Sequence, residues 1–493
     1  KTTRSRLNNA QHWTLSVKSI NNQQSFTMSS GFSKESITTK ISPIVEHGPF
    51  LGTSSDGCSG TVVGFSKYEG VRKAFEENFA RRLELGSQLV VYEKGEKIID
   101  LYGYAPEMES MGYDGDTLQN IASSGKNMEA IAMAMLVDRG LVDYEDLVTK
   151  HWPEFGAKEK NNITIADVMR HSGGVPFVID PDSKNYPDDT ILITPQDVID
   201  VDLLEQKLAS AERYPPLSSC PELGSCYHAI TRGWIVNAIL RRADPSGRSL
   251  SRFLREEITD PLSKVADSGG EVKFFCGIPT EDQPNYKFAN SNFEYMIYKG
   301  VIETGYDDDD NVCEFNKLVS RKNRNTRGVI SWTKDIDSPE ARSIEFSSGG
   351  MCTNARSMAI VNAAAMAGDG SFRGVCLLSP NGVSKSMGDV VTRIETSTGN
   401  SFGFSRGGYS SLKEIFRKDD SGAESYHYPM FAPNDKAAYG DFKGWGGFGG
   451  SLSIVDREKE ISFAYCMNAQ GPNLFGGPRT RRVLLELQKS MAE

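Results

Sequence analysis

The stretch of residues 121–140, IASSGKNMEAIAMAMLVDRG, carries features that bear on both the fold and the chemistry of the chain. Its Ala-rich part predicts a buried helix from Lys126 to Arg139 that ends at Gly140, because small side chains let neighbouring segments approach closely. Ser123 and Lys126 fit the pattern S-x-x-K, and residues three apart share one face of a helix. A desolvated lysine one turn from a serine can accept a proton, so the two are a candidate nucleophile and base.

Three other short patterns compete with this one. Ser410 and Lys413 have the same S-x-x-K spacing. Residues 403–407, GFSRG, match the G-x-S-x-G of a nucleophile elbow around Ser405, but the polar stretch before them does not predict the strand that an elbow requires. Residues 444–449, GWGGFG, contain G-x-G-x-x-G, but they lead into a predicted strand, whereas a dinucleotide site requires a helix there.

The two ends of the chain predict matching structures. Val71, Phe75, Phe79 and Leu83 recur with the period of an amphipathic helix, which two strands follow at 89–92 and 98–102. Near the other end, strands are predicted at about 451–455 and 461–467, followed by a helix at about 479–491. We expect both hairpins to share one antiparallel sheet, with both helices covering it.

Between the ends the sequence predicts mostly helices. Residues 164–167, TIAD, form a capping box that opens one helix, and two further helices are predicted at 234–242 and from about 250 to Asp260-Pro261. The helical lobe therefore spans roughly 125–260. Residues 265–345 show no clear periodicity, and their acidic run at 307–310 predicts a solvated loop because the spacing of a calcium loop is missing.

Composition excludes several classes of protein. The 493 residues carry a formal net charge of −10, which argues against a nucleic-acid partner. No apolar run approaches the roughly 18 residues that a membrane helix needs. The six histidines show no metal-ligand spacing, and no phosphate-binding loop is present, so neither a metal nor another cofactor is expected. Residues 1–46 are rich in Ser, Thr, Asn and Gln, which predicts a flexible or targeting extension before a domain at 47–493. The eight dispersed cysteines favour a cytoplasmic or mitochondrial location.

Several blocks in order resemble one known family. They are residues 123–126 (SSGK), 140–143 (GLVD), 152–155 (WPEF), 163–176 (ITIADVMRHSGGVP), 227–234 (YHAITRGW), 241–245 (RRADP) and 445–452 (WGGFGGSL). Together they are similar to serine β-lactamase-like proteins, in particular to the branch of class C β-lactamases and family VIII carboxylesterases and to eukaryotic β-lactamase-domain proteins. The resemblance runs from about residue 60 to the C-terminus.

This resemblance implies an α+β fold of the β-lactamase/transpeptidase type, an antiparallel sheet flanked by helices with an inserted helical lobe. It implies that Ser123 attacks an acyl carbon while Lys126 and Tyr227 share the proton. Backbone N–H groups of Ser123 and Phe448 would form the oxyanion hole. The substrate pocket would include Trp445, Gly446, Gly447 and His228.

Two departures from the family pattern bear on the substrate. Trp445 stands where β-lactamases carry the lysine of Lys-Thr-Gly, and an indole cannot attract a substrate carboxylate. Ala229 stands where the family's Tyr-x-Asn motif has its amide. Both changes favour neutral or apolar acyl esters as the small-molecule substrate. The sequence therefore predicts a serine carboxylesterase-like hydrolase.

Two other functions stay open at this stage. The same acyl-enzyme could pass its acyl group to an alcohol or amine, which would make the chain an acyltransferase. The chain could also be a structural or assembly protein that keeps the fold, and a homo-oligomer is compatible with the sequence. The 218 residues between Tyr227 and Trp445 (445 minus 227) predict an insertion within 265–345.

Overall fold

The computed structural model describes residues 44–47, 67–176, 178, 193, 195–214, 224–266, 270–292, 336–395, 401–418, 424–425, 441–471 and 477–492. The chain divides into two units, residues 1–42 and 43–493, and all described residues belong to the second. The acidic run at 307–310 and the centre of the predicted insertion lie outside the described residues, as does nearly all of the predicted N-terminal extension.

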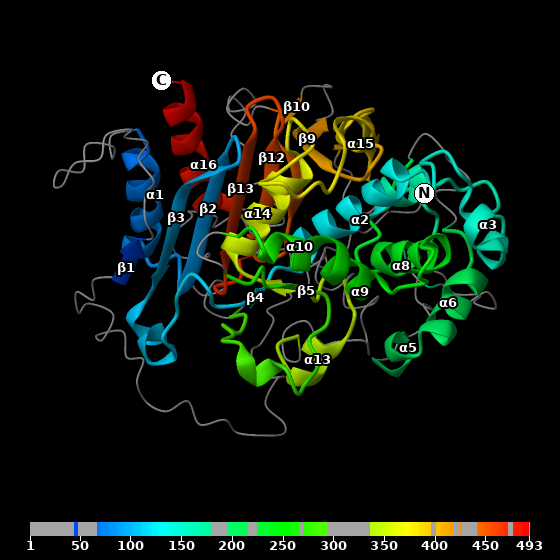
Figure 1. The fold of residues 1–493 in the computed structure, drawn as a ribbon, viewed down its shortest axis with the longest axis horizontal. Coiled ribbons are helices and arrows are strands. Elements are labelled where there is room, and N and C mark those ends of the chain that lie inside the picture. The colour runs from blue at the N-terminus through cyan, green and yellow to red at the C-terminus, as the bar shows by residue number, and fades with distance from the viewer. Residues whose placement is uncertain are drawn as a thin grey trace, which may run out of the picture. The chain divides into compact units, whose positions relative to one another are not determined.

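One antiparallel sheet of ten strands forms the centre of the described fold (Figure 1). Its order is β1-β3-β2-β13-β12-β11-β9-β8-β7, with β10 paired to β9. The strands are β1 (Ile44–His47), β2 (Gly86–Glu93), β3 (Glu96–Tyr104), β7 (Val391–Ile394), β8 (Ser401–Phe404), β9 (Ser410–Lys418), β10 (Glu424–Ser425), β11 (Lys443–Gly446), β12 (Leu452–Asp456) and β13 (Ile461–Met467). Strand β1 pairs with β3, so the sheet begins within the predicted 1–46 extension.

The pairing of β2 with β13 joins the two ends of the chain, as the sequence predicts. Leu89 lies opposite Tyr465 and Val91 opposite Phe463 in this antiparallel pair. On this face the helices α1 (Glu69–Ala80) and α16 (Gly477–Ala492) pack side by side over the strands (Figure 1). Their buried side chains form one core with the sheet: Val71, Phe75, Phe79, Val483, Leu484 and Leu487. Each such side chain stabilises the fold by about 1.5–3 kcal/mol through its burial.

The opposite face of the sheet packs on α2 (Lys126–Asp138) and α14 (Ala355–Ala365). The sheet contributes Val90 and Tyr92 here, while Leu89 and Val91 point to the other core, as the period of a strand requires. Every residue of α2 from Lys126 to Val137 is buried, which confirms the prediction made from its alanines.

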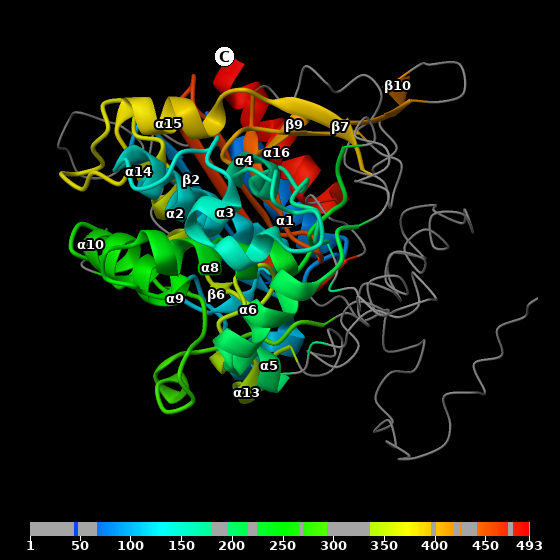
Figure 2. The same ribbon diagram turned by 90° about the vertical axis from the view of Figure 1, so that its right-hand side faces the viewer.

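The helical lobe continues outward from α2 (Figure 2). Its helices are α3 (Val148–His151), α4 (Ile165–Met169), α5 (Pro195–Ile199), α6 (Val201–Ser210), α8 (Thr231–Ala243), α9 (Leu250–Leu254) and α10 (Asp260–Ser263), and α13 (Pro339–Ser343) and α15 (Pro380–Met387) follow later in the chain. The predicted capping box is present, with Thr164 and Asp167 exchanging hydrogen bonds. The predicted helix end at Asp260-Pro261 is wrong. A π-helical turn at Arg255–Thr259 leads directly into α10, which contains Pro261, so the helical segment continues past this proline to Ser263.

A small second sheet, in the order β4-β6-β5, lies beside the start of α2. It consists of β4 (Gln119–Asn120), β5 (Phe274–Phe275) and β6 (Cys352–Thr353). Strand β4 ends three residues before Ser123, so this sheet fixes where the segment that carries Ser123 begins.

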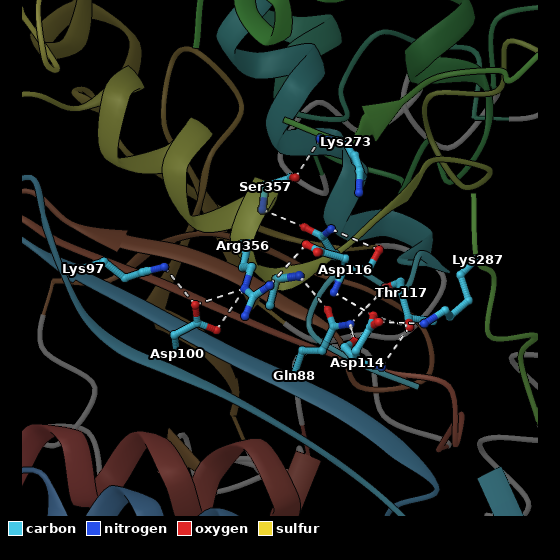
Figure 3. A network of polar contacts seen from close by, with 12 residues as sticks. Gln88, Lys97, Asp100, Asp114, Asp116, Thr117, Lys273, Lys287, Arg356 and Ser357 are labelled. Carbon is cyan, nitrogen blue, oxygen red and sulfur yellow. Dashed lines mark hydrogen bonds and ion pairs between the residues drawn. The ribbon is translucent and has the colours of Figure 1, made fainter. Parts of the chain in front are cut away.

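Polar contacts tie the main sheet to α14 and to the segment before β4 (Figure 3). The side chain of Gln88 donates to the carbonyls of Asp114 (2.8 Å) and Thr117 (2.9 Å) and accepts from the backbone N–H of Ala355 (2.9 Å). Asp100, which is 2% exposed, accepts from Lys97 Nζ (2.8 Å) and Arg356 Nε (3.0 Å). Both sets of contacts hold the first turn of α14 against the sheet.

We expect Asp100→Ala to lower the free energy of unfolding by about 2 kcal/mol, because it leaves two partly buried cations without their shared carboxylate. Asp116→Ala is the matched control. Asp116 also pairs with Arg356 (3.2 Å), but its side chain is 58% exposed, and its loss should cost under about 1 kcal/mol. Urea unfolding of both variants measures the difference, and equal losses would contradict this account of the network.

Candidate active site

Ser123 is presented by a tight turn between β4 and α2. The side chain of Asn120 donates to Gly349 O (3.1 Å) and accepts from the backbone N–H of Ala122 (2.8 Å). Ala122 has a φ of 45°, a left-handed conformation that costs an ordinary residue about 1–2 kcal/mol. Ala122 and Ser124 on either side are buried, whereas Ser123 is only half-buried. The turn therefore leaves the hydroxyl of Ser123 accessible at the first turn before α2.

Lys126 is fully buried, and its amine faces three oxygen atoms. Nζ donates to Ser123 Oγ (3.3 Å), to Ala229 O (2.8 Å) and to Ser348 O (2.7 Å). An ammonium group has three N–H donors, so these acceptors match its full capacity. The amine is thereby fixed beside the serine.

Tyr227 brings a third group to the same point. Its hydroxyl donates to Ser123 Oγ at 2.8 Å, and its backbone N–H donates to Glu395 Oε1 at 3.0 Å. Burial raises the pKa of Tyr227 above its usual value because it disfavours the phenolate, and the hydrogen bond with Ser123 only partly offsets this. The resting phenol is therefore neutral at ordinary pH.

A buried ion pair next to Lys126 supports the arrangement of these three residues. Arg232 and Glu129 are both completely buried and joined at 2.7 Å. Arg232 Nη2 donates to Lys126 O (2.8 Å), and Glu129 Oε1 accepts from the hydroxyls of Ser347 and Ser348 (both 2.8 Å). Sequence reasoning missed this pair. The available signal was the spacing of Glu129, which lies three residues after Lys126 on the same helix.

Trp445 packs behind Tyr227 and is 1% exposed. Its ring is stacked with those of Tyr227 (6.1 Å between centroids) and Phe404 (5.5 Å), and its Nε1 donates to Gly408 O (2.8 Å). Arg232 Cζ lies 4.8 Å from the same ring. Burial thus argues against the predicted role of Trp445 in lining the pocket, because its surface is used in contacts within the protein.

The glycines after Trp445 allow a close approach to the segment just before Ser123. Gly446 and Gly447 are buried, and a Cβ atom at Gly447 would lie 2.2 Å from Ile121 O. Ser451 at the end of this turn donates from Oγ to the same Ile121 carbonyl (2.8 Å). Phe448, half-buried, lies within the turn that these contacts hold beside the segment before Ser123.

His228 does not face the site. It is completely buried, its Nε2 accepts from Val175 N (3.1 Å), and its Nδ1 contacts Cys226 O (2.6 Å). Its backbone N–H donates to Nδ1 of His171, another fully buried ring (3.0 Å). The predicted contact of His228 with substrate is therefore incompatible with its position. The two rings instead join the turn at 171–175 to the segment that carries Tyr227.

The competing serine motifs lack the geometry that they require. Ser405 is fully buried between β8 and β9, and its Oγ accepts from Tyr409 N (3.0 Å). The element that follows it is strand β9, whereas a nucleophile elbow requires a helix there. Ser410 and Lys413 both lie in strand β9, where residues three apart point to opposite faces. The glycines at 444–449 lead from β11 into β12, without the helix of a dinucleotide site.

Among the described residues, no group of three or more His, Cys, Asp or Glu side chains could hold a metal ion. Within the same part of the chain, no helix is both long enough and apolar enough to cross a membrane.

Comparison with known proteins shows the family to which this fold and site belong. The family model described as Beta-lactamase matches residues 71–488, and the chain therefore belongs to the β-lactamase family. The solved structures that resemble it include a family VIII carboxylesterase, with a TM-score of 0.63 and 23% identity over 88% of this chain and 99% of that one. A penicillin-binding protein homologue from Caulobacter crescentus has a TM-score of 0.62 and 24% identity over the same shares. The predicted α+β fold is thus confirmed.

The curated relatives match shorter parts of the chain. The esterase/beta-lactamase LipL of Mycobacterium tuberculosis is 32% identical over 215 residues, which are 43% of this chain and 44% of LipL. A beta-lactamase of Escherichia coli is 27% identical over 104 residues, 21% of this chain and 28% of that protein. The chain thus aligns with less than half the length of either relative.

Burial lowers the pKa of His228 to about 3, whereas an unfolded histidine titrates near 6.5. Between these values the unfolded chain binds more protons, so the free energy of unfolding falls as the pH falls, by up to about 1.4 kcal/mol per pH unit for this residue. We expect His228→Gln, whose amide oxygen can accept from Val175 N, to show a shallower dependence between pH 6.5 and 4. Chemical unfolding at a series of pH values tests this, and parallel curves for variant and wild type would contradict it.

Proposed function

We propose that the chain is a serine hydrolase that cleaves carboxylic esters through an acyl-enzyme on Ser123. The observation that carries the proposal is the short distance from one hydroxyl to both a phenol and an amine. Ser123 Oγ lies 2.8 Å from Tyr227 OH and 3.3 Å from Lys126 Nζ. The resemblance to LipL, an esterase/beta-lactamase, and to a family VIII carboxylesterase supports an ester substrate.

The proposed acylation step moves two protons and needs no external acid or base. As Ser123 Oγ attacks the ester carbon, its proton passes to the oxygen of Tyr227, and the proton of Tyr227 passes to the departing alcohol. The raised pKa of Tyr227 favours this relay over a resting phenolate. Lys126, held on three oxygens, stabilises the negative charge that develops on the serine oxygen. Water then attacks the acyl carbon by the same relay in reverse and frees the acid.

The negative oxygen of the tetrahedral intermediate would be bound by the backbone N–H groups of Ser123 and Phe448. The contacts of Ser451 and Gly447 with Ile121 support this role, because they hold the turn of Phe448 beside the nucleophile segment. One such donor typically contributes about 3 kcal/mol to stabilising the transition state.

The substrate is proposed to be a neutral or apolar ester. Trp445 is buried and its indole N–H is bound to Gly408 O, so this position presents no cation to a substrate carboxylate. The carbonyl of Ala229 accepts from Lys126, and its methyl group has no polar atom to offer an amide. A charge-assisted bond that is absent would weaken binding of an anionic β-lactam by about 1.5–3 kcal/mol.

The buried lysine argues against a purely structural role. A lysine ammonium taken out of water costs several kcal/mol, which the three oxygens around Lys126 have to offset, and a purely structural scaffold has no need of this group. An acyltransferase would use the same acyl-enzyme, so product analysis with and without an added alcohol separates the two catalytic functions.

Ser123→Ala should lower hydrolysis of short-chain p-nitrophenyl esters at least 1,000-fold, because the nucleophile is removed. It should also abolish labelling by a fluorophosphonate probe. Ser405→Ala is the matched control at the competing motif, and its rate should stay within about threefold of wild type, since its buried hydroxyl contacts only the local turn. The reverse order of the two variants would move the nucleophile to Ser405 and refute the proposal.

The substrate class is tested separately with the wild-type chain. We expect kcat/KM for p-nitrophenyl butyrate to exceed that for nitrocefin, a β-lactam carrying a carboxylate, by at least tenfold, a factor that corresponds to about 1.4 kcal/mol. Faster turnover of nitrocefin would contradict the ester assignment while leaving Ser123 as the nucleophile.

A further inference from the structure

A second buried ion pair lies on the other face of the sheet, between Glu84 and Arg479. The side chains are 0% and 2% exposed, and Arg479 Nη1 lies 2.7 Å from Glu84 Oε2. Tyr465 OH donates to the other carboxylate oxygen at 2.6 Å. Glu84 precedes β2 and Arg479 lies in the first turn of α16, so the pair joins the two ends of the described fold.

The same guanidinium reaches the turn that carries Phe448. Arg479 Nη2 donates to Gly449 O at 3.0 Å, and the next residue, Thr480, donates from Oγ1 to Gly450 O at 3.1 Å. A backbone N–H, that of Gly471, also donates to Gly449 O (2.8 Å). Gly449 and Gly450 have φ values of 103° and 113°, a conformation that needs external contacts to define it.

The turn is therefore held from two sides. Ser451 Oγ binds Ile121 O on the side of the nucleophile, and the first turn of α16 binds the carbonyls of Gly449 and Gly450 on the other. Phe448 lies between these anchors, one residue before Gly449. Its backbone position thus depends on both.

We propose that Arg479, oriented by Glu84, is a positioning residue that sets the oxyanion-binding turn at Phe448. This inference rests on the proposed function. A mispositioned donor weakens binding of the transition state more than binding of the substrate, and displacement by about 1 Å can cost up to about 100-fold in rate. The pair therefore acts on kcat through Phe448 and not through contact with substrate.

Arg479→Lys tests this role. A lysine keeps a cation for Glu84 but has a single nitrogen, so it cannot hold Glu84 Oε2 and Gly449 O in the same fork geometry. We expect kcat for p-nitrophenyl butyrate to fall about tenfold while KM changes less than about twofold. Glu84→Gln keeps an oxygen acceptor for Arg479, so its kcat should fall less than that of Arg479→Lys.

Arg248→Lys is the matched control. Arg248 is 10% exposed and binds Asp244 through two nitrogens (both 2.9 Å), at the junction of α8 and α9. It should lose stability without a fall in kcat. Thermal unfolding is measured for every variant, and if Arg479→Lys does not fold, Thr480→Val takes its place, with an expected fall in kcat of about threefold.

The outcomes separate the two proposals. An unchanged kcat, a change confined to KM, or an equal fall in Arg248→Lys would overturn the positioning role while Ser123-dependent turnover of the wild type persists. Wild-type protein without Ser123-dependent ester turnover would overturn the proposed function and this inference with it.

Discussion

The arrangement of the site depends on one buried amine and the oxygens around it. Lys126 Nζ contacts the carbonyls of Ala229 and Ser348 and the hydroxyl of Ser123, which come from three separate parts of the chain. Burying this group without partners would cost several kcal/mol, so the three segments must be placed correctly for the helix α2 to pack at all. The contacts that satisfy the lysine amine therefore also hold it beside the serine hydroxyl. Correct folding of these segments and preorganisation of the site thus depend on the same contacts.

The sheet provides the rigid frame for that requirement. Strand β11 carries Trp445, whose ring stacks with that of Tyr227, and it ends in the glycine turn beside Ile121. Strand β4 delivers Asn120, whose side chain fixes the strained residue before Ser123. A buried ion pair lies next to each of these two segments. Glu129–Arg232 contacts the backbone of Lys126, and Glu84–Arg479 contacts the turn that follows Phe448. Both arginines also donate to backbone carbonyls, Arg232 to Lys126 O and Arg479 to Gly449 O, and these bonds help each buried pair to specify the local geometry.

The sequence predicts structure well where the apolar pattern or motif lies within a short stretch of the chain. The terminal hairpins were predictable because their apolar residues are separated by clear turns. Motif spacing and family resemblance proposed Ser123, Lys126 and Tyr227 as one site, and the structure brings these three side chains together. Strands β8 and β11 were missed because glycine interrupts both, in SFGF and KGWG, and weakens the strand signal. The Glu129–Arg232 pair spans 103 residues, a separation that no local periodicity reports. His228 was misplaced because adjacency to Tyr227 in sequence does not fix which way a ring turns in an irregular segment.

The proposed mechanism forms a covalent acyl group on one serine. Peptide mass mapping after rapid acid quench of the chain with p-nitrophenyl butyrate detects such a group and locates it. We predict a single butyryl group per chain, on the peptide that contains Ser123. Sustained release of nitrophenol with the acyl group on another residue, or with none on any peptide under conditions that trap it, would contradict the account.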